Sequence, residues 1–288
     1  MDKDLLKKVQ SKELEILNEI IKICENHNLR YYAIGGTCLG AVRHQGFIPW
    51  DDDIDIAMPD CDYEKFRLYA QNELPPHLKI SDGSDNQYYG LMFMKVHNTK
   101  TTFVEKNSES YPEGYRGIFV DIKPFYGVPD PGLKRWWFIK KVKFYLRANW
   151  KRRFPFKESK KLMSKFLWVL LSPAKILVKY DFFYKKDIKF LKKRKFDSSN
   201  YTGFTWWDRG IKRLILDKSY FDDYILMNFE NIQIRCPIGW EKYLTQHFGD
   251  YTSLPPENER NSGHELAIVD IDNPYTYYQK CKQGKNIC

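Results

Sequence analysis

Aspartates alternate with apolar residues at positions 51 to 56, where the chain reads DDDIDI. An extended backbone turns every second side chain to the same face, so we expect Asp51, Asp53 and Asp55 to point together. Carboxylates this close repel one another, and one must hold a proton unless a cation neutralises them. Mg²⁺ and Mn²⁺ prefer such hard oxygen ligands, and Mg²⁺ often binds substrate phosphate as well. The pattern therefore predicts a divalent metal site that serves phosphate chemistry.

An acidic turn at the surface is the alternative interpretation of three successive aspartates. Ile54 and Ile56 argue against it, because they alternate with the acids as a half-buried strand requires. Pro49 and Trp50 come directly before the acids, and such a stiff, apolar pair of residues is unusual in a solvated loop. We therefore prefer the metal site.

A glycine pair precedes the acids and is suited to holding a phosphate. Gly35 and Gly36 follow a short apolar run, and without Cβ atoms they allow close backbone approach to a ligand and positive φ. Thr37 to Arg43 is expected to form one or two helical turns whose free N–H groups face an anion. Arg43 would then lie beside the phosphate and bind it through two hydrogen bonds, although an exposed arginine paired with an acid explains it equally well.

The sequence from Gly35 to Met58, GGTCLGAVRHQGFIPWDDDIDIAM, resembles the signature of the LicD family, phosphotransferases related to fukutin and the fukutin-related protein. A weaker likeness extends to GIFVDIKPF around Asp121 and to CPIGWEKYLTQHFGDYTSLPP near the C-terminus. The resemblance implies a nucleotidyltransferase-like fold and metal-dependent transfer of a phospho-alcohol from a CDP-activated donor to a sugar hydroxyl of a glycan. It also assigns Asp121 a place as the third metal ligand or as the base that takes the proton from the attacking hydroxyl.

Three further polar residues are candidates for the same site. Asp121 lies in a largely apolar segment, Gly117 to Pro124, that predicts a buried strand, so its carboxylate needs a partner, which a backbone turn could also provide. Lys95, in an expected strand from Tyr89 to Val96, could reach the β-phosphate or could lie at a solvated strand edge. His264 could reach a pyrophosphate or contact a carboxylate, although a lone histidine is more often structural.

Residues 134–195 differ in composition from the rest of the chain. They hold 22 Lys and Arg against three acids, so their net charge of +19 exceeds the +10 of the whole protein. Tryptophan, phenylalanine and tyrosine alternate with these charges, which predicts contact with an anionic membrane surface. The run FLWVLL from Phe166 to Leu171 is too short to cross a bilayer. A helical subdomain with solvated basic faces is the alternative, and nucleic acid is disfavoured because no recognisable nucleic-acid module accompanies the segment.

The chain of 288 residues is long enough for a sizeable core, and its 43% hydrophobic residues exclude a disordered protein. We expect an α/β fold: a nucleotidyltransferase-like mixed sheet flanked by helices, beginning with an amphipathic helix from Leu5 to Asn28 and a strand from Leu29 to Ile34. The expected parts are a catalytic core (1–130), a basic helical insertion (131–196) and a C-terminal part that completes the substrate site (197–288). Six cysteines without a CxxC pair and an N-terminus without an apolar leader predict a cytoplasmic protein, peripheral at the inner face of the plasma membrane.

The combined hypothesis is attack by a hydroxyl of a glycan or its lipid-linked precursor on the β-phosphorus of a CDP-linked alcohol, most simply CDP-choline, with release of CMP. Mg²⁺ or Mn²⁺ would be held by Asp51, Asp53, Asp55 and Asp121, and the remaining expected substrate contacts are Gly35, Gly36, Thr37, Arg43, Trp50, Lys95 and His264. Two alternatives stay open. One is a nucleotidyltransferase that uses an NTP and releases pyrophosphate, and the other is a non-enzymatic protein that binds membranes or nucleic acid.

Overall fold

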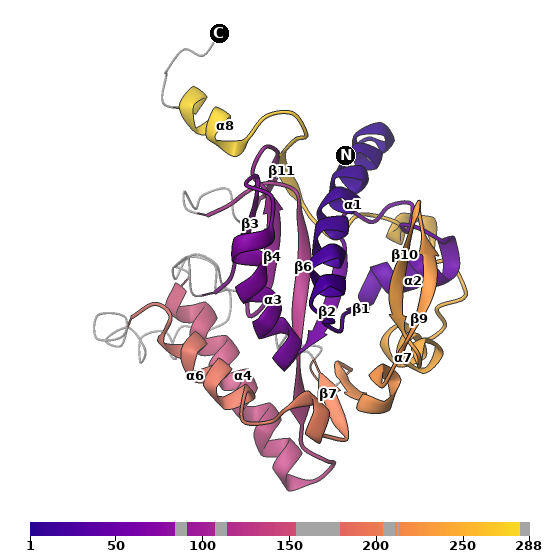
Figure 1. Cartoon of the computed structure of the whole chain (residues 1–288), viewed down its shortest axis with the longest axis vertical. Coiled ribbons are helices and arrows are strands. Elements are labelled where there is room, and N and C mark those ends of the chain that lie inside the picture. The colour runs from indigo at the N-terminus through magenta and orange to yellow at the C-terminus, as the bar shows by residue number, and fades with distance from the viewer. Residues whose placement is uncertain (84–90, 107–113, 154–178, 204–210, 212, 283–288) are drawn as a thin grey trace. The chain divides into compact units, whose positions relative to one another are not determined.

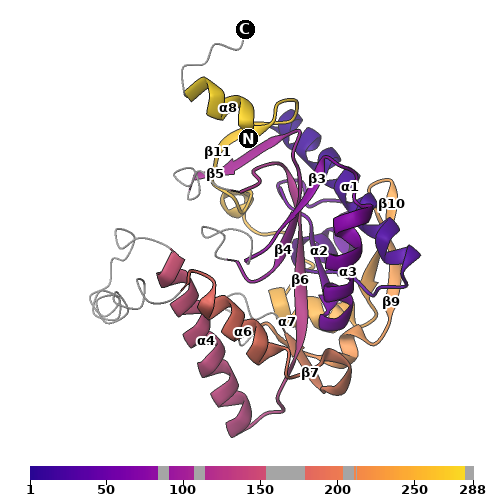
Figure 2. The same cartoon turned by 60° about the vertical axis from the view of Figure 1, so that its left-hand side comes forward.

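The fold is α/β, with a curled mixed sheet flanked by helices, as the sequence predicted. Figures 1 and 2 show it from two directions. The computed structural model describes residues 1–83, 91–106, 114–153, 179–203, 211 and 213–282.

The chain divides into two compact units. Unit 1 comprises Met1–Ser81, Met94–Pro124 and Ser219–Cys288, and unit 2 comprises Asp82–Phe93 and Phe125–Lys218. The C-terminal segment therefore folds with the N-terminal one, and all the predicted site residues belong to unit 1. The expected boundaries at residues 130 and 196 stay predictions.

Unit 1 is built on a sheet with the strand order β1-β2-β6-β4-β3. The strands are β1 (Tyr32–Ala33), β2 (Asp55–Pro59), β6 (Phe119–Val128), β4 (Met94–Asn98) and β3 (Leu78–Ser81). Residues 119 to 128 of β6 are all buried, and β4 pairs antiparallel with β6. A central strand that is covered on both faces is usually a nearly continuous apolar run, which is why the two charged residues within β6 are informative.

Two helices, α1 (Lys3–Asn26) and α3 (Asp60–Glu73), pack against each other and against this sheet (Figure 1). The side chain of Asp2 accepts a hydrogen bond of 2.8 Å from the amide of Leu5 and so caps the start of α1. Asn28 adopts a positive φ of 51° just beyond its end, a conformation that stops helices. The predicted helix from Leu5 to Asn28 is confirmed to within two residues at each end.

Helix α2 (Gly35–His44) starts directly after β1, so the glycine pair opens a helix as predicted. The expected strand from Leu29 to Ile34 is shorter, because only Tyr32 and Ala33 pair with β2.

The predicted alternation over residues 51–56 is confirmed by burial, because Asp51, Asp53 and Asp55 are half-buried while Asp52, Ile54 and Ile56 are buried. The amide of Asp51 bonds to the carbonyl of Ile48 at 2.9 Å, so the chain turns there, and β2 begins only at Asp55. The regular strand is therefore shorter than the alternating segment.

The C-terminal part of unit 1 adds two antiparallel strand pairs and two helices. Strand β5 pairs antiparallel with β11, and β9 pairs antiparallel with β10. Helix α7 ends at Gly249, which has a positive φ of 77°. The bounds are β5 (Thr102–Glu105), β9 (Tyr224–Phe229), β10 (Ile232–Pro237), α7 (Trp240–Phe248), β11 (Leu266–Asp270) and α8 (Tyr275–Lys282), with short 3-10 turns at Lys218–Phe221 and Glu257–Glu259.

Unit 2 contains helices α4 (Leu133–Arg153) and α6 (Phe182–Leu191), a 3-10 turn at Phe196–Ser198, and strands β7 (Tyr201–Gly203) and β8 (Ile215–Asp217). Strand β7 pairs with β8 and with the last residues of β6. The core gathers residues from α4, α6 and β6, among them Phe138, Val142 and Leu146 at helical spacing along one face of α4. Within the described residues no helix is both long and apolar enough to cross a bilayer, and FLWVLL lies outside them.

Candidate active site

Strand β6 carries two charged side chains on one face, Asp121 and Lys123. They are two residues apart, and in a strand such residues point the same way, while Val120 and Ile122 point to the opposite face. Lys95 on β4 lies directly across from Asp121 in the register of the two strands. Side chains that are paired across strands lie close enough to interact. The sheet therefore places an acid and two lysines together inside the protein, all of them at most 6% exposed.

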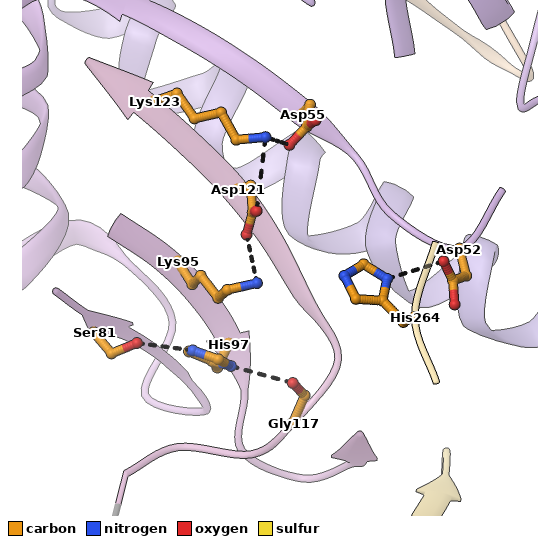
Figure 3. A network of polar contacts seen from close by, with 9 residues as sticks. All are labelled: Asp52, Asp55, Ser81, Lys95, His97, Gly117, Asp121, Lys123 and His264. Carbon is orange, nitrogen blue, oxygen red and sulfur yellow. Dashed lines mark hydrogen bonds and ion pairs between the residues drawn. The ribbon is translucent and has the colours of Figure 1, made fainter. Parts of the chain in front are cut away.

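These three side chains and Asp55 form a line of alternating charge (Figure 3). Lys95 Nζ lies 2.9 Å from Asp121 Oδ1, and Lys123 Nζ lies 3.9 Å from Asp121 Oδ2 and forms a hydrogen-bonded ion pair with Asp55. Burial lowers the pKa of Lys123, but the charges of Asp55 and Asp121 more than offset this and raise it. Lys123 therefore stays protonated, and the two acids keep a neutralising partner.

Asp53, Asp55 and Asp121 converge. Each offers a carboxylate oxygen that lies within 4.8 Å of the other two, and Asp51, Asp52 and Asp53 form a second group with the same spacing. Burial and the charge of Asp55 raise the pKa of Asp51 to about 6, and burial with the charges of Asp55 and Asp51 raises that of Asp53 well above its usual range. Such crowding is costly unless a cation is present.

Asp52 is fully buried and makes a different contact. Its Oδ1 lies 3.0 Å from Nδ1 of His264, in the segment that leads into β11. The imidazole also packs edge-on against Phe103 and Phe119. Burial lowers the pKa of His264, but the hydrogen bond to Asp52 and the charges of Asp53 and Asp52 raise it to about 9. His264 is therefore an imidazolium bound to one of the acids, one of the two contacts that the sequence left open for it.

Glu13 adds a sixth acid near the group. It lies on the buried face of α1, is 1% exposed, and has an Oε2 without a hydrogen-bond partner among the described residues. Burial raises its pKa well above the usual range, and the charges of Asp53, Asp52 and Asp51 raise it further. An acid in this setting is held neutral unless positive charge is nearby.

The glycine pair makes room for the carboxylates. A Cβ on Gly35 would lie 3.2 Å from Asp55 Oδ2, and Gly35 has a positive φ of 55°. The amide of Gly35 donates to the hydroxyl of Tyr243 at 2.7 Å, and the hydroxyl of Thr37 accepts from the amide of Asp55 at 2.8 Å. The start of α2 thus fixes the first residue of β2, and with it the position of the Asp55 carboxylate.

Gly36→Ala is expected to lower activity about 100-fold, because the added Cβ would lie 2.3 Å from Asp51 Oδ2 and displace that side chain by an ångström or more. Gly263→Ala is the matched control, since a Cβ there meets no atom within 4 Å. Turnover and melting temperature should be measured for both. Full activity of a folded Gly36→Ala protein would show that Asp51 need not hold this position.

Arg43 and Trp50 contact other parts of the protein rather than the carboxylates. Arg43 Nη1 donates to the carbonyls of Tyr251 and Ser253 at 3.0 and 3.2 Å, so the arginine holds the loop that follows α7. The ring of Trp50 faces the guanidinium of Arg260 at 5.6 Å. Phosphate or substrate contact by Arg43 and Trp50 stays a prediction.

A buried histidine fixes the strand that carries Lys95. One ring nitrogen of His97 lies 2.8 Å from Ser81 Oγ, and the other lies 3.2 Å from the carbonyl of Gly117 (Figure 3). Burial and the charge of Lys95 lower the pKa of His97 to about 3, so the ring is neutral. His97 therefore ties β4 to β3 and to the segment before β6.

The donor set fits a divalent cation. Asp53, Asp55 and Asp121 supply the hard oxygens that Mg²⁺ and Mn²⁺ prefer, and the nearby Glu13 has a buried Oε2 without a hydrogen-bond partner among the described residues. Lys95, Lys123 and the His264 imidazolium offset only three of the five aspartates at 51, 52, 53, 55 and 121. The remaining negative charge matches one divalent ion.

Comparison with known proteins identifies the family to which the chain belongs. A family model described as "LicD/FKTN/FKRP, nucleotidyltransferase domain" matches residues 28–158. The lipopolysaccharide cholinephosphotransferase LicD of Haemophilus influenzae is 30% identical over 273 residues, which cover 92% of this chain and 97% of that protein. The chain belongs to the LicD family of phosphotransferases. The resemblance seen in the sequence is thereby confirmed.

Two shorter matches are with segments of Rickettsia proteins. An uncharacterised protein of Rickettsia typhi is 43% identical over 108 residues, 35% of this chain and 34% of its own length. An uncharacterised protein of Rickettsia prowazekii is 30% identical over 111 residues, 35% of this chain and 40% of its own length.

Sequence reasoning missed Glu13, Asp52 and Lys123. Glu13 interrupts the apolar stripe of α1, and Lys123 follows Asp121 by two residues in an apolar strand, so both broke a pattern that could have singled them out. Asp52 left no such signal, because the alternation placed it on the buried face with Ile54 and Ile56, and its partner His264 is distant in the sequence.

Proposed function

We propose that this LicD-family protein transfers phosphocholine from CDP-choline to a sugar hydroxyl of lipopolysaccharide or a related glycan, and releases CMP. The convergence of Asp53, Asp55 and Asp121 beside Lys95 and Lys123 carries the proposal, because it gathers opposite charges where a pyrophosphate and its cation would bind. The name of the Haemophilus influenzae relative supports phosphocholine as the group and lipopolysaccharide as the acceptor.

The reaction needs one bond to form and one to break. The acceptor oxygen forms a bond to the phosphorus that carries choline, and the bond from this phosphorus to the oxygen shared with CMP breaks. CMP leaves with that oxygen, and the hydroxyl proton passes to a carboxylate, for which Asp121 is the candidate if it is not a metal ligand.

The side chains of the chain have separate tasks in this scheme. Asp53 and Asp55, with Asp121 or Asp51, would hold Mg²⁺ or Mn²⁺, which when bound supplies positive charge against the pyrophosphate. Lys95 and Lys123 lie where their ammonium groups can add to that charge and orient the phosphates. Gly35, Gly36 and Thr37 keep the carboxylates at their positions and leave space beside them.

Incubation of the purified protein with CDP-choline, Mg²⁺ and lipopolysaccharide that lacks phosphocholine tests the proposal. We expect CMP to form in step with phosphocholine on the glycan, measured by chromatography and mass spectrometry. CDP-glycerol and CDP-ribitol should give little product, and CDP-choline alone among the three should raise the melting temperature, because a ligand that binds only the folded state stabilises it. Transfer of glycerol phosphate or ribitol phosphate instead would overturn the assignment of choline.

A nucleotidyltransferase is the second candidate, favoured by the description of the matching family model. Such an enzyme attacks the α-phosphorus of an NTP and releases pyrophosphate. Assays with the four NTPs and the same acceptor separate the two activities, since pyrophosphate rather than CMP would be the product.

A further inference from the structure

Unit 2 has a groove between α4 and α6 that serves no role in the catalysis proposed above. Its volume is about 510 Å³, and it is lined by four cationic side chains and four aromatic rings. The two helices run side by side in both views (Figures 1 and 2). The cations are Lys134, Lys140, Lys141 and Arg194.

Helix α4 has one face buried in the core of unit 2 and an opposite face that carries exposed aromatic side chains. Phe138, Val142 and Leu146 lie on the inner face and are buried in the core of unit 2. Trp137 and Phe144, seven residues apart, lie on the outer face and are 61% and 51% exposed. Large aromatic side chains exposed together on one face of a protein usually mark a binding surface.

The charges around these rings are of one sign. Helix α4 contains nine lysines and arginines and no acid. The lining cations rest on aromatic rings: Lys141 Nζ is 4.6 Å from the centroid of the Phe190 ring, and the guanidinium of Arg194 is 5.4 Å from that of Phe138. None of the four lining cations forms an ion pair with an acid among the described residues. Their positive charge is therefore available to an anionic partner.

We propose that the α4–α6 groove binds the surface of a bilayer that contains anionic phospholipid. Lipid phosphates pair with Lys134, Lys140, Lys141 and Arg194, while the rings of Trp137 and Phe144 enter the interface between headgroups and acyl chains, where tryptophan is favoured. Leu133, 72% exposed at the start of α4, extends the apolar part of the same surface. A nucleic-acid duplex would satisfy the cations equally, but its bases are stacked inside the helix, and its surface offers little that is apolar to cover Leu133 and Phe144.

Flotation of the full-length protein with vesicles tests this surface, without donor or acceptor, so the result is independent of phosphocholine transfer. We expect binding to vesicles of phosphatidylcholine mixed with phosphatidylglycerol, and little binding to phosphatidylcholine alone. Lys140→Glu combined with Lys141→Glu should raise the lipid concentration at half-binding at least ~30-fold, since each lysine near an anionic surface contributes about fivefold. Lys7→Glu with Lys8→Glu, on the exposed face of α1, is the matched control and should change it little.

Trp137→Ala with Phe144→Ala separates a bilayer from other anions. Both side chains are largely exposed, so the variant should keep its melting temperature and its CMP release. Its vesicle binding should fall about tenfold and more steeply with added salt, while any binding to duplex RNA or DNA should stay unchanged. Equal loss in the Lys7/Lys8 control, unchanged vesicle binding after removal of the two rings, or tighter binding to duplex nucleic acid than to the mixed vesicles would each overturn the proposal.

Discussion

Asp55→Asn and Asp121→Asn are each expected to lower the rate of CMP release on the order of 1,000-fold. Both carboxylates belong to the group of oxygens that lie within 4.8 Å of one another, and loss of a group that stabilises transition-state charge costs about 3–4 kcal/mol. Asparagine keeps the shape of the side chain and one acceptor oxygen, so the fold should survive. The rate should be measured with saturating Mg²⁺ and CDP-choline.

Asp272→Asn is the matched control for these variants, because Asp272 is exposed and lies in the same unit. It should keep full activity. Circular dichroism and melting temperature establish that each variant is folded. A folded Asp55→Asn or Asp121→Asn protein that releases CMP at the wild-type rate would remove these carboxylates from the mechanism.

Lys123→Met is expected to lower the free energy of unfolding by about 3–5 kcal/mol in buffer without divalent cations. Its side chain is only 6% exposed, its ammonium pairs with Asp55, and its loss leaves buried carboxylates without their partner. Urea denaturation gives the free energy directly. Mg²⁺ should stabilise the variant more than the wild type, because the ion replaces the missing positive charge.

Lys12→Met provides the comparison for Lys123. Lys12 pairs with Glu15 at 2.9 Å on the solvent side of α1, and an exposed pair of this kind contributes about 0–1 kcal/mol. Equal losses for the two variants, or a Lys123→Met protein as stable as the wild type without Mg²⁺, would contradict the arrangement of charges described for β6.

Local patterns in the sequence were sufficient for the elements that carry them. The apolar stripe of α1 repeats along its whole length, and Asn28 marks its end, so the helix could be predicted to within two residues. The buried strand around Asp121 was visible because a run of apolar residues surrounds one acid. The family resemblance, rather than any spacing, placed Asp121 with the acids at 53 and 55.

Contacts between distant segments were not predictable in this way. Asp52 meets His264 only because β11 pairs with β5, and nothing within either segment indicates that pairing. Lys95 faces Asp121 through the register of two strands, which a single sequence does not specify. The turn at Ile48 to Asp51 was also not foreseen, and regular strand β2 begins only at Asp55, although residues 51–56 alternate between half-buried and buried as predicted.

The most direct test of the central claim is a crystal structure of the protein with Mn²⁺, in which anomalous scattering locates the ion. We predict one peak within about 2.2 Å of oxygens from Asp53, Asp55 and Asp121, beside the start of α2, and no peak in crystals of Asp121→Asn grown at the same Mn²⁺ concentration. An ion bound elsewhere, or one that binds equally well after Asp121→Asn, would contradict the account.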